Sequence, residues 1–407
     1  MSRFLFLSLP LTGHVNPMVA VAKVLLARGH EVLWAGSESF LRPLAGPDAA
    51  IHPIPLRAHR GQAERGLDAT RSRWEGYILP HTKYTRKGVE AAVEAFRPDL
   101  LVVDQHAIAG PIVAHRFGLP WATVASSAME LTRPFARGLP RVEEWIQQQM
   151  RAAWTTAGHP GEPPWDLRFS PDLVISFLGE DLLDDPAQLP PNTVTVGPSI
   201  APRAPDPDFP FDWLDPARKH VLVTMGTLNM DQAAHFYPRV LAGLEPLGEQ
   251  LQAVVVAPQG TITGEPGHVL VRRPVPVLDL LPHLHAVVSH GGANTVNESL
   301  VHGVPLLVAP IKGDQALMAS AVARAGAGLR VSIDHSRPEA LRAALLDLLD
   351  DPRYAEAARV TGKRLLAGGG ADAAATALIQ LARRSGSSSI LPERTTSESE
   401  QARETPA

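Results

Sequence analysis

The chain has 407 residues, which is too long for one average domain and suits two of roughly 200 residues each. Its formal net charge of −4 gives no reason to expect nucleic acid or an anionic membrane as a partner, and the lack of cysteine excludes disulfides, thiol nucleophiles and thiolate metal sites. The N-terminus lacks a signal-peptide cleavage region, and no apolar run approaches the roughly 20 residues that span a bilayer. We therefore expect a cytoplasmic protein without stable membrane insertion.

Short apolar runs alternate with helical patterns in the first half of the chain, which predicts a parallel α/β sheet. Residues 4–9 predict the first strand and residues 10–16 a loop, after which Asn16 caps a helix and Pro17 occupies its first turn. Residues 52–84 show little periodicity, so we expect a loop and a short helix over a ligand cleft. The arginines of residues 71–86 would grip an acceptor or, more commonly, cover a solvated helix face. Further strands are expected at residues 31–34, 100–104, 121–124, 173–176 and 193–196, and helices at 85–96, 108–117 and 128–150.

A proline-rich segment divides the chain, with six prolines between residues 198 and 216. The expected boundaries are an N-terminal domain at 1–200, a stiff linker at 201–216, a second domain at 217–383 and a disordered tail at 384–407, which is polar and poor in aromatic residues. The second half restarts the strand–loop–helix pattern, with strands at 221–225, 253–257 and 269–272, and helices from about 231 and near 338–349, 353–366 and 371–382. The fold class is α/β, with two doubly wound Rossmann-like domains that face each other across a cleft.

Residues 286–315 organise the second domain. An apolar run predicts a buried strand, and the two glycines after it let the backbone turn sharply beside a ligand. A helix that begins after such a turn presents free N–H groups and its positive dipole end to a phosphate. Glu298 lies about two turns into that helix, where it can meet sugar hydroxyls, and Asp314 with Gln315 follows the next strand at the same sheet edge. These residues predict a site for a diphosphate with hydroxyls, hence a nucleotide-sugar.

The pattern His-x-Gly-x-Asn-Thr-x-x-Glu, followed by Gly-Val-Pro and Asp-Gln, resembles the donor signature of nucleotide-sugar-dependent glycosyltransferases that act on small molecules. This family includes plant UDP-glycosyltransferases and actinomycete antibiotic-tailoring enzymes. The resemblance covers residues 3–382 and implies the two-domain GT-B fold, in which the last helix, here 371–382, crosses back onto the first domain. It also implies that the histidine and the Asn-Thr pair contact the diphosphate, the glutamate holds the ribose, and the Asp-Gln pair holds the transferred sugar. Carried over, the donor site comprises His290, Gly292, Asn294, Thr295, Glu298, Asp314 and Gln315.

His14 is the best candidate for the base that takes a proton from the acceptor. It follows the first strand in Gly-His-x-x-Pro, a second resemblance to the family, and imidazole titrates near neutral pH. Asp104 ends a strand of the same sheet and can orient His14, as in the family's His-Asp dyad; the alternative is an ordinary carboxylate at a strand end. His106 is a competitor, either as an acceptor contact or as the base itself.

Two further positions belong to the expected donor site. Thr227 follows the first strand of the second domain and resembles the family's Gly-Ser/Thr at the diphosphate; its alternative role is a helix cap. Val275 would present its backbone to the nucleobase, while Val277 replaces a glutamine common in the family, which leaves uridine and thymidine both open. No cofactor and no metal are expected, since helix dipole and histidine replace a cation. The expected partners are a UDP- or TDP-sugar and a small hydrophobic acceptor, with the protein a monomer or homodimer.

The function that these residues and the resemblance predict is an inverting glycosyltransferase, specifically a hexosyltransferase of secondary metabolism such as antibiotic biosynthesis. Inversion is implied by the family alone. The acceptor would be a hydroxyl of a polyketide, macrolide, flavonoid or similar compound. One alternative is a nucleotide-sugar 2-epimerase of the same fold, and another is a non-catalytic auxiliary partner of a glycosyltransferase. A nicotinamide dehydrogenase is disfavoured because neither first βα turn carries Gly-x-Gly-x-x-Gly.

Overall fold

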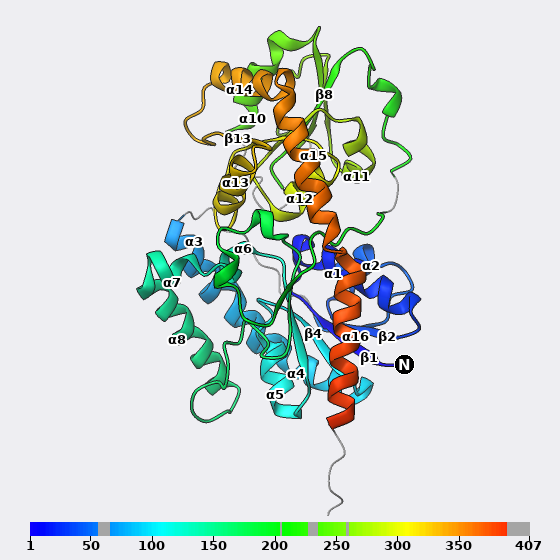
Figure 1. Cartoon of the computed structure of the whole chain (residues 1–407), viewed down its shortest axis with the longest axis vertical. Coiled ribbons are helices and arrows are strands. Elements are labelled where there is room, and N and C mark those ends of the chain that lie inside the picture. The colour runs from blue at the N-terminus through cyan, green and yellow to red at the C-terminus, as the bar shows by residue number, and fades with distance from the viewer. Residues whose placement is uncertain (56–65, 204–205, 227–234, 258–259, 389–407) are drawn as a thin grey trace, which may run out of the picture.

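Two parallel β-sheets, one in each half of the chain, form the frame of the molecule (Figure 1). The computed structural model describes residues 1–407 apart from 56–65, 204–205, 227–234, 258–259 and 389–407. Within these residues the first sheet has the strand order β3-β2-β1-β4-β5-β6-β7 and the second β10-β9-β8-β11-β12-β13. In both sheets the order reverses beside a central strand, β1 or β8, which is where open α/β sheets bind ligands. The prediction of two doubly wound α/β domains is confirmed.

The strands of both sheets are mostly buried because helices cover the two faces of each sheet. Strands buried on both faces appear in a sequence as continuous apolar runs, which explains why the central ones were recognisable. Their bounds in the first sheet are β1 Arg3–Leu7, β2 Glu31–Gly36, β3 Ile51–Pro53, β4 Leu100–Asp104, β5 Trp121–Ala125, β6 Val174–Ser176 and β7 Thr193–Thr195. In the second sheet they are β8 Lys219–Thr224, β9 Leu251–Val256, β10 Val269–Arg272, β11 Ala286–Ser289, β12 Leu306–Val308 and β13 Gly328–Arg330.

The helices of the first domain include one continuous stretch of α3, η1 and α4, of which residues 85–96 were predicted. The loop and short helix expected at residues 52–84 are wrong in extent, since β3 begins the segment and helix runs from Gly66 onward. The periodicity was missing because α3 buries no residue; the stretch is anchored by the π-helical turn η1, where Trp74, Tyr77 and Ile78 are buried. The helices are α1 Thr12–Ala27, α2 Glu38–Ala45, α3 Gly66–Arg73, η1 Trp74–Ile78, α4 Leu79–Phe96, α5 Ala109–Phe117, α6 Ala128–Leu131, α7 Pro134–Gly138 and α8 Pro140–Thr156.

Helix α1 begins earlier than the sequence suggested. The expected loop at residues 10–16 is helical from Thr12, and Pro17 lies inside the helix rather than in its first turn. A proline at this position removes the N–H that would bond the carbonyl of Gly13 four residues before it. The helix tolerates this loss because Gly13 finds another donor, as described below. His14 consequently projects from the first turn of a helix and not from a loop.

Two helices, α15 and then α16, lead from the second domain back to the first. Helix α15 packs against α12, and α16 then lies along α1, with Ala374, Ala375 and Leu378 in the same apolar cluster as β1 (Figure 1). Helix α16 extends to Ser388, so the disordered tail expected from residue 384 does not begin there. The helices of this half are α10 Tyr237–Leu244, α11 Val277–Leu280, α12 Ala293–Val301, α13 Gln315–Arg324, α14 Pro338–Asp350, α15 Pro352–Ala367 and α16 Gly370–Ser388.

By length and composition alone, Pro352–Ser385 is apolar enough to cross a membrane, contrary to the expectation that no stretch qualifies. It comprises α15 and most of α16, which pack on α12 and α1. One such stretch is a weak sign of a membrane span, because core helices pass the same test.

Short 3-10 helices occupy several connections, and the proline-rich segment packs against the second domain. Phe209 of that segment is buried in an apolar cluster with Leu280 and Leu284. The 3-10 helices are η2 Glu180–Leu182, η3 Pro186–Gln188, η4 Phe211–Trp213, η5 Glu245–Leu247 and η6 Leu281–His283.

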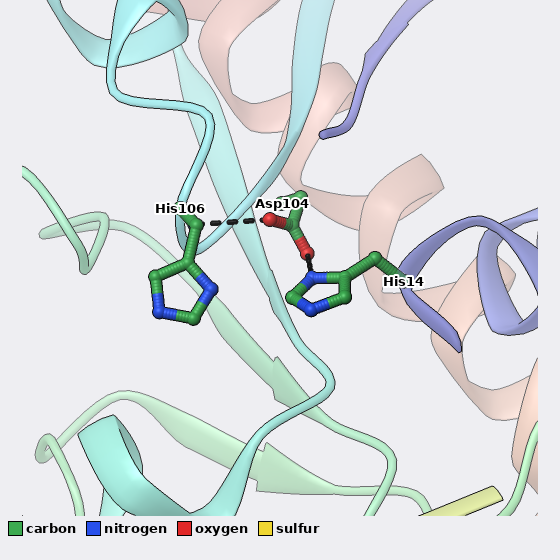
Figure 2. A group of neighbouring side chains, drawn as sticks. All are labelled: His14, Asp104 and His106. Atoms are coloured by element: carbon green, nitrogen blue, oxygen red, sulfur yellow. Dashed lines mark hydrogen bonds and ion pairs between the residues drawn. The ribbon is translucent and has the colours of Figure 1, made fainter. Parts of the chain in front are cut away.

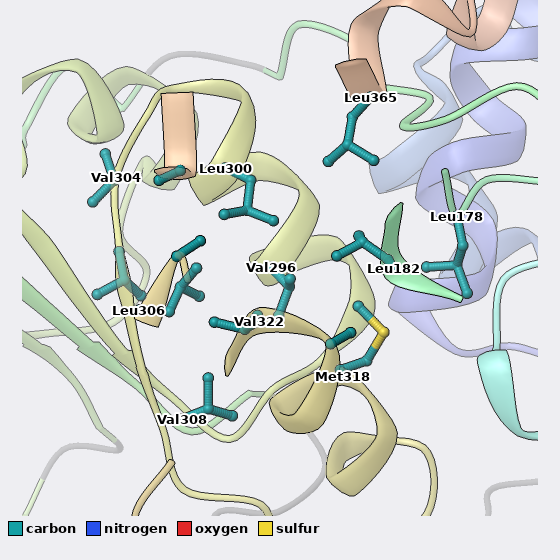
Figure 3. Packing of buried hydrophobic residues seen from close by; sticks show 14 of the residues in the cluster. Leu178, Leu182, Val296, Leu300, Val304, Leu306, Val308, Met318, Val322 and Leu365 are labelled. Carbon is teal, nitrogen blue, oxygen red and sulfur yellow. The ribbon is translucent and has the colours of Figure 1, made fainter. Parts of the chain in front are cut away.

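An apolar core joins the two domains on one side of the cleft. Leu178 and Leu182 of the first domain pack into a cluster with Val296, Met318 and Leu365 of the second half (Figure 3). Each is almost fully buried, and burial of such a side chain stabilises the structure by about 1.5–3 kcal/mol. The contact holds the two carboxyl edges of the sheets at a defined separation.

Candidate active site

His14 and Asp104 form a hydrogen-bonded pair at the carboxyl edge of the first sheet. Nδ1 of His14, in the first turn of α1, lies 2.7 Å from Oδ2 of Asp104, the last residue of β4 (Figure 2). The Asp104 side chain is fully buried, whereas His14 is 17% exposed. Burial alone would lower the pKa of His14, but the charge and hydrogen bond of Asp104 outweigh it and raise that pKa above its ordinary value. Burial alone would raise the pKa of Asp104, but the charge and hydrogen bond of His14 outweigh it and lower that pKa. The expected contact is therefore present, and a carboxylate at Asp104 leaves Nε2 of His14 as the proton-accepting nitrogen.

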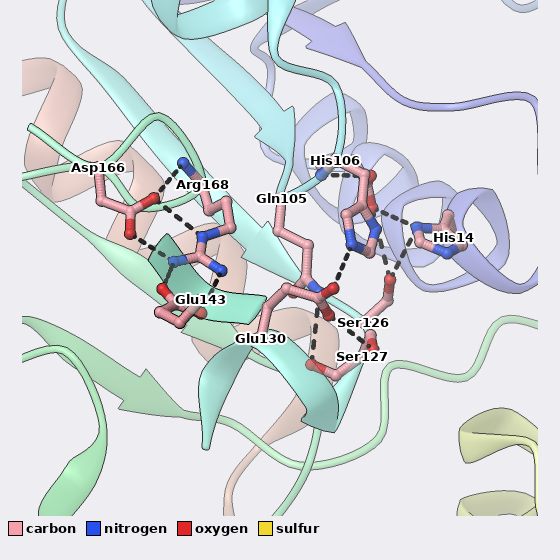
Figure 4. A network of polar contacts seen from close by, with 10 residues as sticks. His14, Gln105, His106, Ser126, Ser127, Glu130, Glu143, Asp166 and Arg168 are labelled. Carbon is pink, nitrogen blue, oxygen red and sulfur yellow. Dashed lines mark hydrogen bonds and ion pairs between the residues drawn. The ribbon is translucent and has the colours of Figure 1, made fainter. Parts of the chain in front are cut away.

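A second histidine–carboxylate pair lies directly behind the first. The backbone N–H of His106 donates to Oδ1 of Asp104 at 3.0 Å, and its ring Nε2 lies 2.9 Å from Oε1 of Glu130. Burial opposes ionisation of Glu130, yet the charge and hydrogen bond of His106 hold its pKa well below its usual range. Gln105 and Ser127 complete the shell by donating to the other oxygen of Glu130 (Figure 4). His106 is 1% exposed and its ring Nε2 is paired with Glu130, so the geometry favours His14 over His106 as the base.

The ligand atoms of His14, Asp104 and His106 lie within 4.8 Å of one another, close enough to hold a metal ion. One ring nitrogen of each histidine is already used in the pairs just described, Nδ1 of His14 with Asp104 and Nε2 of His106 with Glu130. A metal bound through Nδ1 of His14 would displace its hydrogen bond to Asp104. The donor set fits a base and its orienting carboxylate better than a cation site.

Across the cleft, His290 is enclosed between two glycines. A side chain at Gly226 would place its Cβ 2.7 Å from the imidazole, and one at Gly292 would place it 2.8 Å away, so neither position accepts even alanine without a shift of the ring. Burial lowers the pKa of His290 to about 4, and a hydrogen bond with the Thr224 backbone opposes this only in part. His290 is therefore neutral at pH 7 and stands at the end of β11, beside the helix N-terminus that the sequence predicted.

The N-terminus of α12 points toward the base. Gly292 has the N-cap position, and the first helical hydrogen bond is donated by Val296 to the Gly292 carbonyl. The N–H groups of residues 293–295 are thus outside the helical pattern, as an anion site requires. The Asn294 side chain donates to the carbonyl of Gly13 at 3.1 Å, which is the carbonyl freed by Pro17. This bond places the donor motif within one residue of His14.

The remaining predicted donor residues surround the same helix. Glu298 lies two turns into α12, is 5% exposed and forms an ion pair with Arg203. Burial raises the pKa of Asp314, at the N-cap of α13, and the positive charge of Arg73 opposes this rise in part. Gln315 uses Oε1 to accept from the N–H groups of residues 311 and 312 at 2.8 and 3.0 Å.

Three predicted donor positions remain. Val275 follows β10, next to α11, and packs on the inter-domain apolar cluster. Thr295 lies in the first turn of α12. Thr227 lies outside the described residues.

Several polar residues of the site were missed in the sequence. Ser126 contacts both members of the dyad, at 3.1 Å from Nδ1 of His14 and 3.4 Å from Oδ2 of Asp104. It follows β5 just as Asp104 ends β4, so a search along the carboxyl edge would have found it. Glu130 had no local signal, and Arg73 lies in the arginine-rich stretch for which a solvated helix face was the commoner expectation. The Arg73 guanidinium reaches across the cleft to Gly313, where Nη2 lies 3.1 Å from the position that an added Cβ would occupy. Part of the Arg-rich stretch therefore faces the site and not solvent.

The chain resembles known proteins along nearly its whole length. Residues 246–380 match the family model described as "Erythromycin biosynthesis protein CIII-like, C-terminal domain". The chain is 29% identical to 4′-demethylrebeccamycin synthase of Lentzea aerocolonigenes, over 87% of this chain and 93% of that protein. It is 26% identical to YojK of Bacillus subtilis (strain 168), described as an uncharacterized UDP-glucosyltransferase, over 93% of this chain and 97% of that protein. Among solved structures, the glycotransferase of kitacinnamycin matches with a TM-score of 0.81 at 25% identity, covering 93% of this chain and 99% of that one.

Proposed function

We propose a mechanism on the premise that this chain belongs to the nucleotide-sugar-dependent glycosyltransferases of the two-domain GT-B fold, which include the antibiotic-tailoring enzymes. It is an enzyme that transfers a sugar to a natural product. In the proposed reaction, Nε2 of His14 takes the proton from an acceptor hydroxyl while the second domain holds a UDP- or TDP-sugar. The observation that carries this proposal is the His14–Asp104 hydrogen bond of 2.7 Å, placed within one residue of the Asn294 contact.

The acceptor oxygen attacks the anomeric carbon from the side opposite the diphosphate. The new C–O bond forms as the bond to the diphosphate oxygen breaks, the proton stays on His14, and the configuration of the sugar inverts. The negative charge that develops on the leaving diphosphate faces the free N–H groups of α12, with His290 and Thr295 beside them. Fixed dipoles of this kind stabilise developing charge without reorganisation, so the proposal includes no metal and no cofactor.

Asp314 and Gln315 are proposed to hold the transferred sugar, and Glu298 the ribose. Gln315 has its side-chain oxygen engaged with backbone N–H groups, so its amide nitrogen is the group that can reach a sugar hydroxyl. Thr227 and the backbone at Val275 complete the proposed donor site, at the diphosphate and the nucleobase.

A hydrophobic acceptor is supported by the surroundings of the dyad. An apolar cluster joins Leu9, which follows β1, to Trp74, Tyr77 and Ile78 of η1 and to Ile108, which precedes α5. Tyr77 is close enough to Asp104 for the carboxylate to raise its phenol pKa together with burial. Burial lowers the pKa of His81 to about 4, so this neighbour stays neutral. We propose a polyketide, macrolide, flavonoid or similar compound as the acceptor, and a cytoplasmic monomer or homodimer as the working form.

The test is a donor screen with and without acceptors. UDP-glucose, other UDP-sugars and several TDP-sugars are incubated with the enzyme and with a mixed panel of polyphenols and polyketides, and both nucleoside diphosphate and glycoside are measured. We expect release that depends on an acceptor and yields an inverted glycoside. Turnover should survive EDTA.

Each other outcome points elsewhere. Conversion of the sugar without any acceptor would mean a 2-epimerase. Donor binding without turnover, but with activation of a second glycosyltransferase, would mean an auxiliary protein. Failure to bind every nucleotide-sugar would refute the donor site and the catalytic roles that depend on it.

A further inference from the structure

Arg203 covers the carboxylate that the proposed function assigns to the ribose. It lies in the proline-rich segment between the domains, and its guanidinium Nη2 donates to Oε1 of Glu298. Glu298 is almost completely buried, while the Arg203 side chain is 41% exposed. Both residues line a cavity of about 1010 Å³ between the domains, together with Ser199, Asn294 and Asn297. A partly exposed, charged side chain from the segment therefore reaches the face of α12 that carries the donor motif.

The pair engages one of the two carboxylate oxygens of Glu298. Burial alone raises the pKa of the Glu298 carboxyl, and the positive charge of Arg203 opposes that rise and favours the ionised form. Within the described part of the chain, Arg203 is the side chain that hydrogen-bonds this carboxylate. With Oε1 engaged in a charge-assisted bond, Oε2 is the oxygen that remains for a ligand.

The two nucleotide classes differ in what they ask of such a carboxylate. Ribose in a uridine nucleotide presents two neighbouring hydroxyls, at 2′ and 3′, which a carboxylate with both oxygens available accepts together. The sugar of a thymidine nucleotide lacks the 2′-hydroxyl and needs one oxygen only. A ribonucleotide must either displace Arg203 from the carboxylate or leave its 2′-hydroxyl without a hydrogen bond to Glu298. The second option weakens binding, because burying a polar group without a partner costs free energy.

We propose that Arg203 is a specificity-determining residue that makes this site select 2′-deoxyribonucleoside diphosphates, and hence TDP-sugars over UDP-sugars. The inference rests on the proposed function, since it takes Glu298 as the ribose ligand. It does not depend on the nucleobase, for which the proposed contact is Val275 rather than α12.

The experiment separates the sugar from the base. Binding of UDP, 2′-deoxy-UDP and TDP is measured by isothermal titration calorimetry with the wild-type protein, with Arg203→Ala and with the control Arg218→Ala. Arg218 is a half-buried arginine of the second domain that pairs with Asp215 at 3.3 Å, away from the cavity. The UDP to 2′-deoxy-UDP comparison isolates the 2′-hydroxyl, and the 2′-deoxy-UDP to TDP comparison isolates the thymine methyl group.

We expect the wild-type protein to bind 2′-deoxy-UDP more tightly than UDP. Arg203→Ala should change the ratio of the UDP and 2′-deoxy-UDP dissociation constants by about tenfold in favour of UDP, which corresponds to the free energy of one hydrogen bond to a charged group. The ratio of the 2′-deoxy-UDP and TDP dissociation constants should stay constant. The control should leave both ratios unchanged. An unchanged UDP ratio in Arg203→Ala would overturn the inference, and so would a shift toward 2′-deoxy-UDP, which would mean that Arg203 itself binds the 2′-hydroxyl. Absence of binding by all three nucleotides to the wild-type protein would instead refute the proposed function.

Discussion

Replacing Asp104 with asparagine tests the proposed base most directly. The substitution keeps the size of the side chain but removes the charge that accepts from His14 at 2.7 Å. A hydrogen bond to a charged group contributes about 1.5–3 kcal/mol, which corresponds to a loss of about 10–150-fold in kcat. The loss can be larger, because an asparagine amide can donate to Nδ1 and leave the proton on Nε2, the nitrogen that has to accept.

The pH profile supplies an independent sign. His14 acts as a base only when neutral, and Asp104 raises its pKa, so wild-type kcat/KM should rise with pH through a value above 6.5. In Asp104→Asn this acidic limb should move to lower pH even as the maximum falls. The assay is glycoside formation followed from pH 5 to 9.

The matched control is Ser126→Ala, which removes a neutral neighbour of both dyad atoms and keeps the carboxylate. A neutral hydrogen bond contributes about 0.5–1.5 kcal/mol, so we expect a loss of roughly 2–13-fold and a limb that stays in place. If Asp104→Asn kept full activity with an unmoved limb, the base would have to be sought elsewhere, first at His106.

Three further predictions concern the donor site and the domain contact. Gly292→Ala should weaken nucleotide binding at least about tenfold in calorimetry, because the new Cβ would lie 2.8 Å from the His290 ring. The control Gly267→Ala, with open space around the new Cβ, should leave the affinity unchanged. Equal affinities of the two variants would contradict this geometry. His290→Gln should flatten the acid limb of urea-unfolding stability. The pKa of His290 is about 4 in the folded state and 6.5 in the unfolded state, so the unfolded state binds a proton first as the pH falls. The free energy of unfolding of the wild-type protein should therefore fall by up to about 3 kcal/mol between pH 6.5 and pH 4. The same fall in His290→Gln would refute the assignment. Leu178→Ala should lower the free energy of unfolding by about 2–4 kcal/mol in the same assay. The control Leu366→Ala, at an exposed position, should lower it by less than about 0.5 kcal/mol. Similar losses in both variants would show that the inter-domain cluster contributes little to stability.

The sequence predicted best where buried strands and glycine turns coincide. Residues 286–315 were expected to form strand, turn, helix and strand, and the structure has β11, α12 and β12 at these places. Both signals are local, since a strand covered on two faces needs a continuous apolar run and a sharp turn needs glycine. The contact between His14 and Asp104 was also accessible, because parallel topology brings the ends of β1 and β4 to one edge. Its geometry was not, because a sequence does not fix the side-chain rotamers of residues 90 positions apart.

The elements that were missed lack such local signals. Helix α3 has no buried face, and its helical state depends on the anchored turn that follows it. Glu130 and Arg203 carry no pattern around them, and each becomes part of the site only when distant segments meet. Their long side chains reach partners far along the chain, an interaction that neither spacing nor periodicity encodes.

The start of α1 shows how two motifs that look independent act as one. Proline in the Gly-His-x-x-Pro pattern suggested a helix start, since Pro17 suits a first turn. Within the helix it instead removes the N–H that would occupy the Gly13 carbonyl, and Asn294 of the donor motif donates to that carbonyl. The same bond connects the backbone beside the base to the N-terminus of α12, where the diphosphate is proposed to lie. Proline in one domain and asparagine in the other thus set the distance between His14 and the donor, which is the quantity on which transfer between two bound substrates depends.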